Sequence, residues 1–125
     1  MKLNHECVRD VLLTLESLPD NEYIDSENHI EYDQIQKYQK SDFVYSVQKL
    51  IEANYINAGV LRTLDGDSYA VNSLTWDGHQ FLDNIRDNTV WAETKNKVGS
   101  AVASASLSII AEVASSFIKS KFGLN

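Results

Sequence analysis

Several residue types are scarce in this sequence, and each shortage excludes a class of protein. A single cysteine, Cys7, cannot form a disulfide within the chain, which favours a reducing compartment with the cytoplasm as the default. The first residues contain no basic stretch followed by an apolar run, so we expect no secretory signal. The only proline, Pro19, lies where a helical pattern ends. A cytoplasmic protein of 125 residues with one hydrophobic core is therefore expected.

Positive charge is also scarce. The chain has 11 basic and 18 acidic residues, which gives a net charge of -7. Because neutralised phosphates supply most non-specific affinity for nucleic acids, this balance disfavours polyanionic partners. Acids are concentrated in residues 1–40, whereas Glu112 is the only acid in residues 98–125. This uneven distribution predicts two surfaces with different roles.

Motifs that carry common enzyme chemistry are missing as well. The sequence has no glycine-rich phosphate loop, no serine elbow and no helix with paired metal-binding histidines. Cys7 also lacks a sequence context that would activate its thiol as a nucleophile. We therefore expect no enzyme, no cofactor and no catalytic residue.

A histidine among carboxylates is the strongest candidate for a metal site. On a helix, His79, Asp83 and Asp87 would share one face, because each is four residues from the next. A metal needs three or four converging ligands with supporting partners, and no further cluster supplies them. His5 and Cys7 point to different helix faces and match no standard zinc spacing. We therefore predict no metal site.

Apolar periodicity predicts two strong helices in the first half of the chain. The first covers residues 4–19, with Asn4 as its cap and Pro19 at its end. The second covers residues 41–55 and begins at Ser41 or Asp42. Their buried stripes are Val8, Val11, Leu12, Leu15 and Leu18 in the first, and Val44, Val47, Leu50 and Ile51 in the second. Between them we expect a loop with a short strand near residues 29–32, then a short helix near residues 33–39.

The second half begins with a predicted β-hairpin. Two β-prone runs, residues 55–64 and 68–71, are joined by Asp65-Gly66-Asp67, and the turn needs a positive φ that glycine tolerates. Thr75 is predicted to cap the next helix, which continues through Trp91 or breaks near Asn88. Residues 98–121 have the pattern of a final helix rich in alanine and serine.

This order of elements matches the winged helix-turn-helix plan. We expect an α+β, mainly helical fold, with a winged helix-turn-helix-like domain over residues 1–97 and a small-residue-rich C-terminal helix over residues 98–125. Periodicity alone also allows other α+β arrangements.

One stretch carries a resemblance to a known family. The segment "LTWDGHQFLDNIRDNTVW" (residues 74–91), followed by "TKNKVGS" and a small-residue tail, resembles the family called domain of unknown function 2513, small bacterial and phage-borne proteins. The similarity also covers "VRDVLLTLE" and "LIEANYI". The resemblance implies a winged-helix-like fold and a frequent viral or prophage setting. It implies no reaction and no catalytic residue.

Four residues of this stretch, Trp76, Gly78, His79 and Phe81, are predicted to lock the fold. Phe81 and Trp76 are expected to pack inward together with Leu82 and Ile85. Glycine is unfavourable inside a helix, so Gly78 indicates a close approach of backbone segments. His79 is expected to hydrogen-bond to a neighbouring segment. Trp91 can be a core edge or a partner contact.

Two surfaces are candidates for function. Tyr45, Gln48, Lys49 and Arg62 would face DNA or another partner if the second helix and the hairpin act as in a winged helix. Residues 41–68 nevertheless contain only two bases against four acids. The other surface is an apolar stripe of the final helix. Its residues are Val102, Ile109, Val113 and Phe117.

The final helix is expected to mediate self-association, as a homodimer or higher oligomer, because its apolar stripe needs a partner surface. The 21 residues from 98 to 118 contain one charge, Glu112, and reach the length of a membrane span, but their six serines disfavour one. We predict a non-enzymatic protein-interaction module of phage or mobile-element type, with a host protein or defence complex as a further partner. The alternative is a winged-helix DNA-binding transcriptional regulator.

Overall fold

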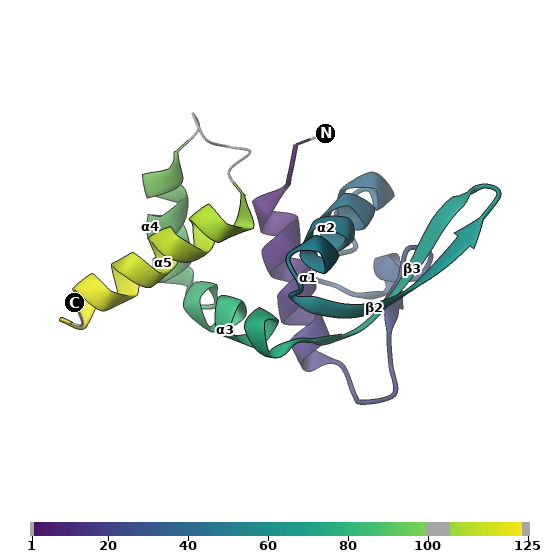
Figure 1. The fold of residues 1–125 in the computed structure, drawn as a ribbon, viewed down its shortest axis with the longest axis horizontal. Helices are drawn as coiled ribbons and strands as arrows, with labels where there is room; N and C mark the ends of the chain where they lie inside the picture. The colour runs from purple at the N-terminus through teal and green to yellow at the C-terminus, as the bar shows by residue number, and fades with distance from the viewer. Residues whose placement is uncertain (1, 100–105, 124–125) are drawn as a thin grey trace.

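The computed structural model describes residues 2–99 and 106–123 and has the predicted α+β, mainly helical class (Figure 1). Three antiparallel strands form a sheet in the order β1–β3–β2. The elements, in chain order, are α1 (His5–Ser17), β1 (Ile24–Asp25), η1 (His29–Glu31), α2 (Lys40–Glu52), β2 (Ile56–Thr63), β3 (Gly66–Leu74), α3 (Trp76–Ile85), α4 (Asn88–Val98) and α5 (Leu107–Lys121).

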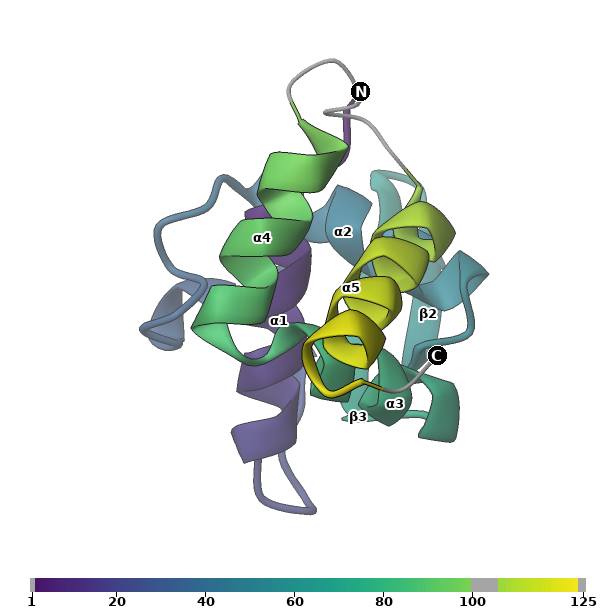
Figure 2. The ribbon, with the colours of Figure 1, turned by 90° about the vertical axis from the view of Figure 1, so that its left-hand side faces the viewer.

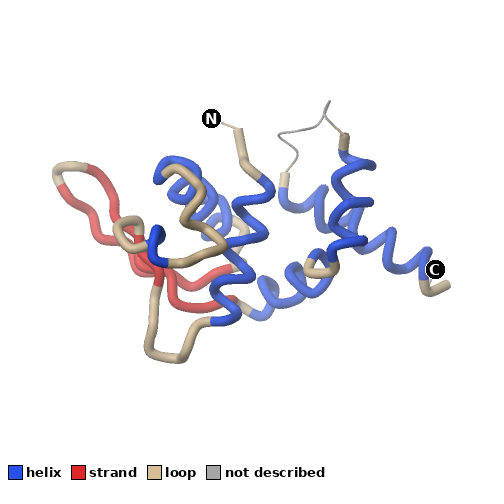
Figure 3. Tube along the Cα trace, turned by 180° about the vertical axis from the view of Figure 1, so that it is seen from behind, coloured by secondary structure: helices blue, strands red, loops and turns tan. Residues whose placement is uncertain are grey.

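The molecule is elongated, with the β2–β3 hairpin at one end and α4 and α5 at the other (Figures 1 and 3). The helix α1 lies between these ends and contacts α2, α3 and β3. Seen from the helical end, α4 and α5 lie side by side in front of α1 (Figure 2). Among the described residues, none of the helices is long and apolar enough to cross a membrane.

The first helix forms as predicted. The Asn4 side chain accepts a hydrogen bond from the backbone N–H of Cys7 at 3.1 Å, which satisfies one of the free donors at the helix start. The helix ends at Ser17, two residues before Pro19. Its predicted stripe is buried except at Leu18, which is half-buried.

The segment between α1 and α2 differs from the prediction. The strand expected near residues 29–32 is a 3-10 helix, and the strand of this segment is β1, which pairs with Ala70 and Val71. The cause is local, because the Asp25 and Asn28 side chains bond to nearby backbone N–H groups and form a tight turn. The short helix expected at residues 33–39 is a run of turns around the buried Ile35.

The helix α2 begins at Lys40, not at Ser41 or Asp42, and no side chain caps it. Its buried face also differs from the predicted one. Phe43, Val47 and Leu50 are fully buried, whereas Val44 and Ile51 are half-buried. The helix is turned so that Phe43 enters the core, where its ring stacks on His29 at 5.1 Å between centroids.

The hairpin is confirmed. Thr63 pairs with Gly66, so Leu64 and Asp65 form the turn, and Gly66 has the expected positive φ of 116°. The strand β3 is longer than predicted and ends at Leu74, directly before the α3 cap. The Thr75 side chain accepts from the N–H of Gly78 at 3.0 Å, as expected for that cap.

The C-terminal half is divided into more helices than predicted. A break does occur near Asn88, where the Asp87 side chain caps α4. The single helix predicted over residues 98–121 is wrong, because Val98 ends α4, and Gly99 has a positive φ of 70°. The predicted domain boundary at residue 98 therefore falls inside α4. The next described helix, α5, begins at Leu107 after its cap, Ser106.

Candidate functional site

The charged residues of the stretch 74–91 have structural partners. The Arg86 guanidinium donates two hydrogen bonds to the Glu16 carboxylate of α1, one of them at 2.7 Å, and a further bond to Asp83 at 2.7 Å. Asp87 caps α4. Asp83 and Asp87, two of the carboxylates suspected as metal ligands with His79, therefore bind protein groups, whereas His79 and Asp77 are exposed. In the described part of the chain, no group of three or more His, Cys, Asp or Glu side chains could hold a metal ion.

The Arg86 bridge predicts a pH dependence of stability. Hydrogen bonding to Arg86 holds the pKa of Glu16 below its ordinary value in the folded protein. A carboxyl group whose pKa is lower in the folded than in the unfolded chain stabilises the fold at pH values above its unfolded-state pKa. This stabilisation is lost as the pH falls through the folded-state pKa of the same group. Glu16→Gln should therefore be less stable than the parent at pH 7, and this difference should shrink as the pH is lowered toward 3.

Urea unfolding at a series of pH values measures this difference. Glu31→Gln, at an exposed residue of η1, is the matched control and should follow the parent at every pH. A Glu16→Gln curve parallel to the parent over the whole range would contradict the proposed bridge.

Cys7 lies in the core and is fully buried. Burial raises the pKa of its thiol to about 11, and the nearby Ser46 hydroxyl acts in the opposite direction. A nucleophilic cysteine needs a thiolate near neutral pH and access to its target. The Cys7 side chain therefore acts as a small apolar group of the core.

The four residues predicted to lock the fold have different environments. The inward positions of α3 are Gly78, Phe81, Leu82 and Ile85, a spacing of three, four and seven residues. Trp76 does not share this face and is 76% exposed, so the prediction that it packs inward is wrong. His79 is also exposed, and the expected hydrogen bond of its side chain to a neighbouring segment stays a prediction.

Gly78 lies at a close backbone approach. A Cβ at this position would lie 1.9 Å from the carbonyl oxygen of Tyr55. This separation is too short for any residue with a side chain. The neighbouring Phe81 ring stacks on the Tyr55 ring with 4.8 Å between centroids. The start of α3 is therefore pressed against the chain between α2 and β2.

Trp91 is a core residue, since it is only 4% exposed. Its indole N–H donates to Glu6 at 3.0 Å, and the cationic groups of Arg9 and Lys95 lie 5.6 and 5.7 Å from its ring. Arg9 also donates to the backbone carbonyls at the end of α3, including Ile85 at 2.9 Å. Arg9 thus connects α1 to the end of α3 and to α4.

The other candidate residues belong to a surface between α2 and the hairpin. We call it the α2–hairpin surface. It surrounds a groove of about 310 Å³, lined by Gln48, Ile51, Glu52, Val60, Arg62, Asp67 and Tyr69. Gln48 donates to the Tyr69 hydroxyl at 3.0 Å. Of the residues predicted from the sequence, Gln48 and Arg62 meet in this groove, and Tyr45 and Lys49 continue the surface along α2.

Both cations of this surface are paired with carboxylates. Lys49 lies 3.1 Å from Glu52, and its ammonium group is 5.4 Å from the centre of the Tyr45 ring. Arg62 lies 2.9 Å from Asp67 on the neighbouring strand. Contact with a phosphate would have to compete with these carboxylates. The surface is therefore close to neutral despite its charged side chains.

The hairpin also carries exposed apolar side chains that the sequence patterns did not indicate, with Val60 in the groove and Leu61 on the opposite face of the strand. Val60, Leu61 and Leu64 are 43%, 66% and 106% exposed. Their exposure was not predictable from alternation, because the outer half of the hairpin extends beyond the helices (Figure 1). Exposed apolar side chains grouped on one element are typical of a contact surface for another protein.

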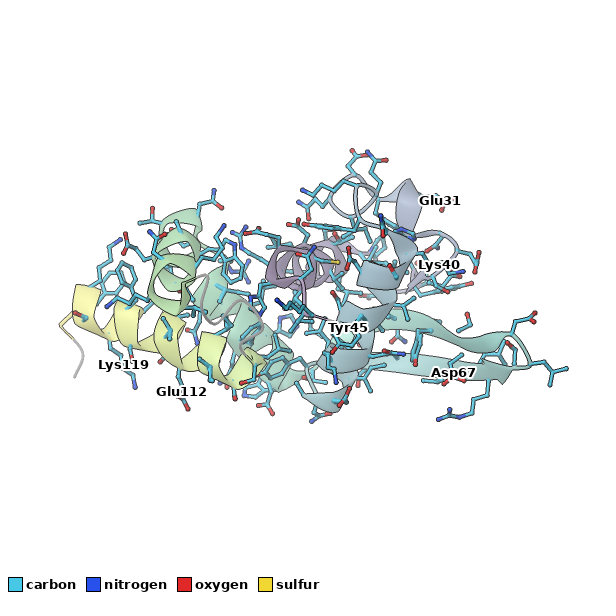
Figure 4. All side chains as sticks on the ribbon, turned by 90° about the horizontal axis from the view of Figure 1, so that it is seen from above. Glu31, Lys40, Tyr45, Asp67, Glu112 and Lys119 are labelled. Carbon is cyan, nitrogen blue, oxygen red and sulfur yellow. The ribbon has the colours of Figure 1, made fainter. Side chains whose placement is uncertain are left out.

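The predicted stripe of the final helix has a mixed environment. The buried residues of α5 are Leu107, Ile110 and Ala114, and the helix contacts α3 and α4. Ile109 is 46% exposed, Val113 and Phe117 are half-buried against the core, and Val102 lies outside the described residues. Figure 4 shows α5, with Glu112 and Lys119, far from Tyr45 and Asp67 on the α2–hairpin surface.

The sequence is similar to that of other proteins. The family model described as "Hypothetical protein (DUF2513)" matches residues 2–104. An uncharacterised protein of Haemophilus influenzae is 31% identical over 118 residues, which cover 94% of this chain and 96% of that protein. No solved structure matches the chain.

Proposed function

This chain belongs to the DUF2513 family, and from that premise we propose that it is a protein-interaction module that binds another protein through its α2–hairpin surface. The observation that carries the proposal is the combination of paired charges and exposed apolar side chains on one surface. Val60 on β2 and the half-buried Ile51 on α2 offer apolar area in the groove, and Arg62 is already neutralised by Asp67. A protein partner gains affinity by covering apolar area, whereas nucleic acid needs free cations.

A winged-helix-like arrangement supports this location. The sheet order β1–β3–β2, with α1 before β1 and α2 directly before the hairpin, is compatible with the winged helix-turn-helix plan. In that plan α2 takes the place of the recognition helix and the hairpin takes the place of the wing. The proposed binding surface is therefore the surface that such a fold commonly presents to its partner.

A DNA-binding regulator is the second candidate, and the same topology favours it. Tyr45, Gln48 and Lys49 lie on α2, where a recognition helix would present side chains to the major groove. The net charge of -7 and the carboxylates beside Lys49 and Arg62 oppose this function. We therefore rank it below protein binding.

Self-association through the C-terminal helix has less support than binding at the α2–hairpin surface. One side of α5 already packs on the rest of the chain, since its residues Ile110 and Ala114 are buried in the core. Ile109 and Phe122, which are 46% and 67% exposed, are left for an outside contact. Two such side chains provide little apolar area for a stable dimer.

Binding to random and genomic DNA across a salt series separates the two candidates. We expect weak binding that is insensitive to Lys49→Ala and Arg62→Ala. Lys119→Ala, at the opposite end of the molecule, is the matched control for the loss of one positive charge (Figure 4). Affinity that falls steeply with salt and drops in the Lys49 and Arg62 variants but not in the control would favour DNA binding instead.

Site-specific photo-crosslinking in cells tests the protein partner directly. A photoreactive residue in place of Tyr45 should form a covalent adduct with one protein of defined mass. The same residue in place of Lys119 should not form that adduct. Identical adducts from both positions, or none from Tyr45, would contradict binding at the α2–hairpin surface.

A further inference from the structure

The outer edge of β2 is open. The strand lies at the end of the sheet order β1–β3–β2, and in the part of the chain that the structure describes no other strand pairs with that edge. Its eight residues, Ile56–Thr63, form a long strand whose outer half extends away from the helices (Figures 1 and 3). A free edge presents a row of unpaired backbone N–H and C=O groups that another strand can bond.

This edge lacks the features that usually prevent pairing. Natural edge strands are protected by proline, by lysine and other charges, or by short length. β2 contains no proline and one charged residue, Arg62, which is held by Asp67 on β3. A register shift between Asn57 and Ala58 lies near the start of the strand, and the pairing from Ala58 to Thr63 is regular. The outer half of β2 is therefore a suitable template for another strand.

From these features we infer that β2 pairs antiparallel with β2 of a second copy of this chain, forming a symmetric dimer with a continuous six-stranded sheet. The inference goes beyond the proposed function and does not depend on it. An antiparallel pair related by a two-fold axis uses the same residues on both copies, so one strand can supply both sides of the contact.

The charge and the apolar residues of β2 select the register. Pairing centred on Arg62 would place two guanidinium groups opposite each other, which is destabilising. Pairing centred on Leu61 instead places each Leu61 against the other, covering a side chain that is 66% exposed in the single chain. Each Arg62 then lies opposite Val60 of the second copy, beside a groove that the carboxylate of Glu52 lines. This register pairs the two apolar Leu61 side chains and places each Arg62 beside the groove of the other copy that Glu52 lines.

The flanking residues fit the same register. Thr63 of each copy lies opposite Gly59 of the other, on the face that carries Leu61. Gly59 has no atoms of its own chain within 4 Å of the position where a Cβ would lie, so there is open space beside the Leu61 pair. Leu64 follows the last residue of β2, and in this register it lies opposite Ala58 of the other copy, three residues from the two-fold axis, so the two Leu64 side chains do not face each other.

Two matched variants test the dimer. Sedimentation equilibrium of the full chain should give a dimer. Leu61→Lys should weaken dimerisation at least about tenfold, because the pair would bring two ammonium groups together. Leu64→Lys makes the same chemical change on the same hairpin at a more exposed position, and it should leave the dimer unchanged because the two new ammonium groups would lie far apart. Circular dichroism checks that both variants fold.

Thiol cross-linking tests the register. Directly opposite residues in an antiparallel pair have Cβ atoms about 5 Å apart. Leu61→Cys should therefore give a covalent dimer with a short bifunctional maleimide, while Leu64→Cys and the parent, whose Cys7 is buried, should not. A parent that is monomeric, a dimer that survives Leu61→Lys, or equal cross-linking at both positions would overturn the inference. A dimer that persists in Leu61→Lys would indicate another interface.

Discussion

Gly78→Ala is expected to lower the free energy of unfolding by about 3 kcal/mol or more. The added methyl carbon would lie 1.9 Å from the carbonyl oxygen and 2.9 Å from the carbonyl carbon of Tyr55. Both are backbone atoms, so no rotation of a flexible side chain can relieve the overlap. The helix α3 would have to move away from the segment that follows α2.

That movement would also break neighbouring contacts. The backbone N–H of Thr75 donates to the same Tyr55 carbonyl at 3.0 Å, and its hydroxyl donates to the carbonyl of Asn54 at 2.6 Å. The stacked rings of Tyr55 and Phe81 would separate as well. The steric overlap, the hydrogen bonds and the ring contact thus change together, so the effect should exceed that of a typical single substitution.

Urea unfolding followed by far-ultraviolet circular dichroism measures the loss. Gly59→Ala is the control, because the same substitution there meets no atom within 4 Å. The control should stay within about 0.5 kcal/mol of the parent. A similar stability for both variants would mean that α3 does not pack against Tyr55 as described.

Ile110→Ala is expected to lower the free energy of unfolding by about 2 to 4 kcal/mol. Ile110 is 1% exposed and belongs to the buried face of α5, together with Leu107 and Ala114. Shortening it removes buried apolar area and leaves a cavity that the surrounding helices fill only in part. This prediction tests whether α5 is part of the core or a separate tail.

Ile109→Ala is the matched control, since it makes the same change at the adjacent residue. Ile109 is 46% exposed, so its replacement should lower the free energy of unfolding by less than about 1 kcal/mol. Denaturant unfolding and sedimentation of both variants should be measured together. Equal effects on stability would contradict the orientation of α5, and a change of oligomeric state confined to Ile109→Ala would restore self-association through this helix.

Signals that depend on a few adjacent residues predicted the fold well. The Asn4 cap, the end of α1 before Pro19, the Asp65-Gly66 turn and the Thr75 cap all occur as expected. Each is a hydrogen bond or a backbone preference that forms within about four residues of the chain. The break before α4 is of the same kind, since the Asp87 side chain bonds to Thr89 and Val90.

The candidate site was less predictable. Tyr45, Gln48, Lys49 and Arg62 were identified as a surface, but their neighbours were not. The partners of Arg62 and Gln48 are Asp67 and Tyr69, and these pairings follow from the packing of α2 on the hairpin. The exposure of Leu61 depends on how far the hairpin extends beyond the helices, which alternation along a strand does not report.

The sequence by itself determined the helix and turn boundaries that local caps define, the α+β class and the family. Only the tertiary structure decided which side of each helix is buried. In α2 both Val44 and Phe43 lie on an apolar stripe that includes Val47, and the packing of His29 selects Phe43. In α3 the approach of Tyr55 places Gly78 inside and leaves Trp76 outside. Arg86 and Glu16 are 70 residues apart, so their bridge also depends on how the helices pack. A helix with more than one apolar stripe has no local preference between them, and the contacts that choose one come from distant parts of the chain.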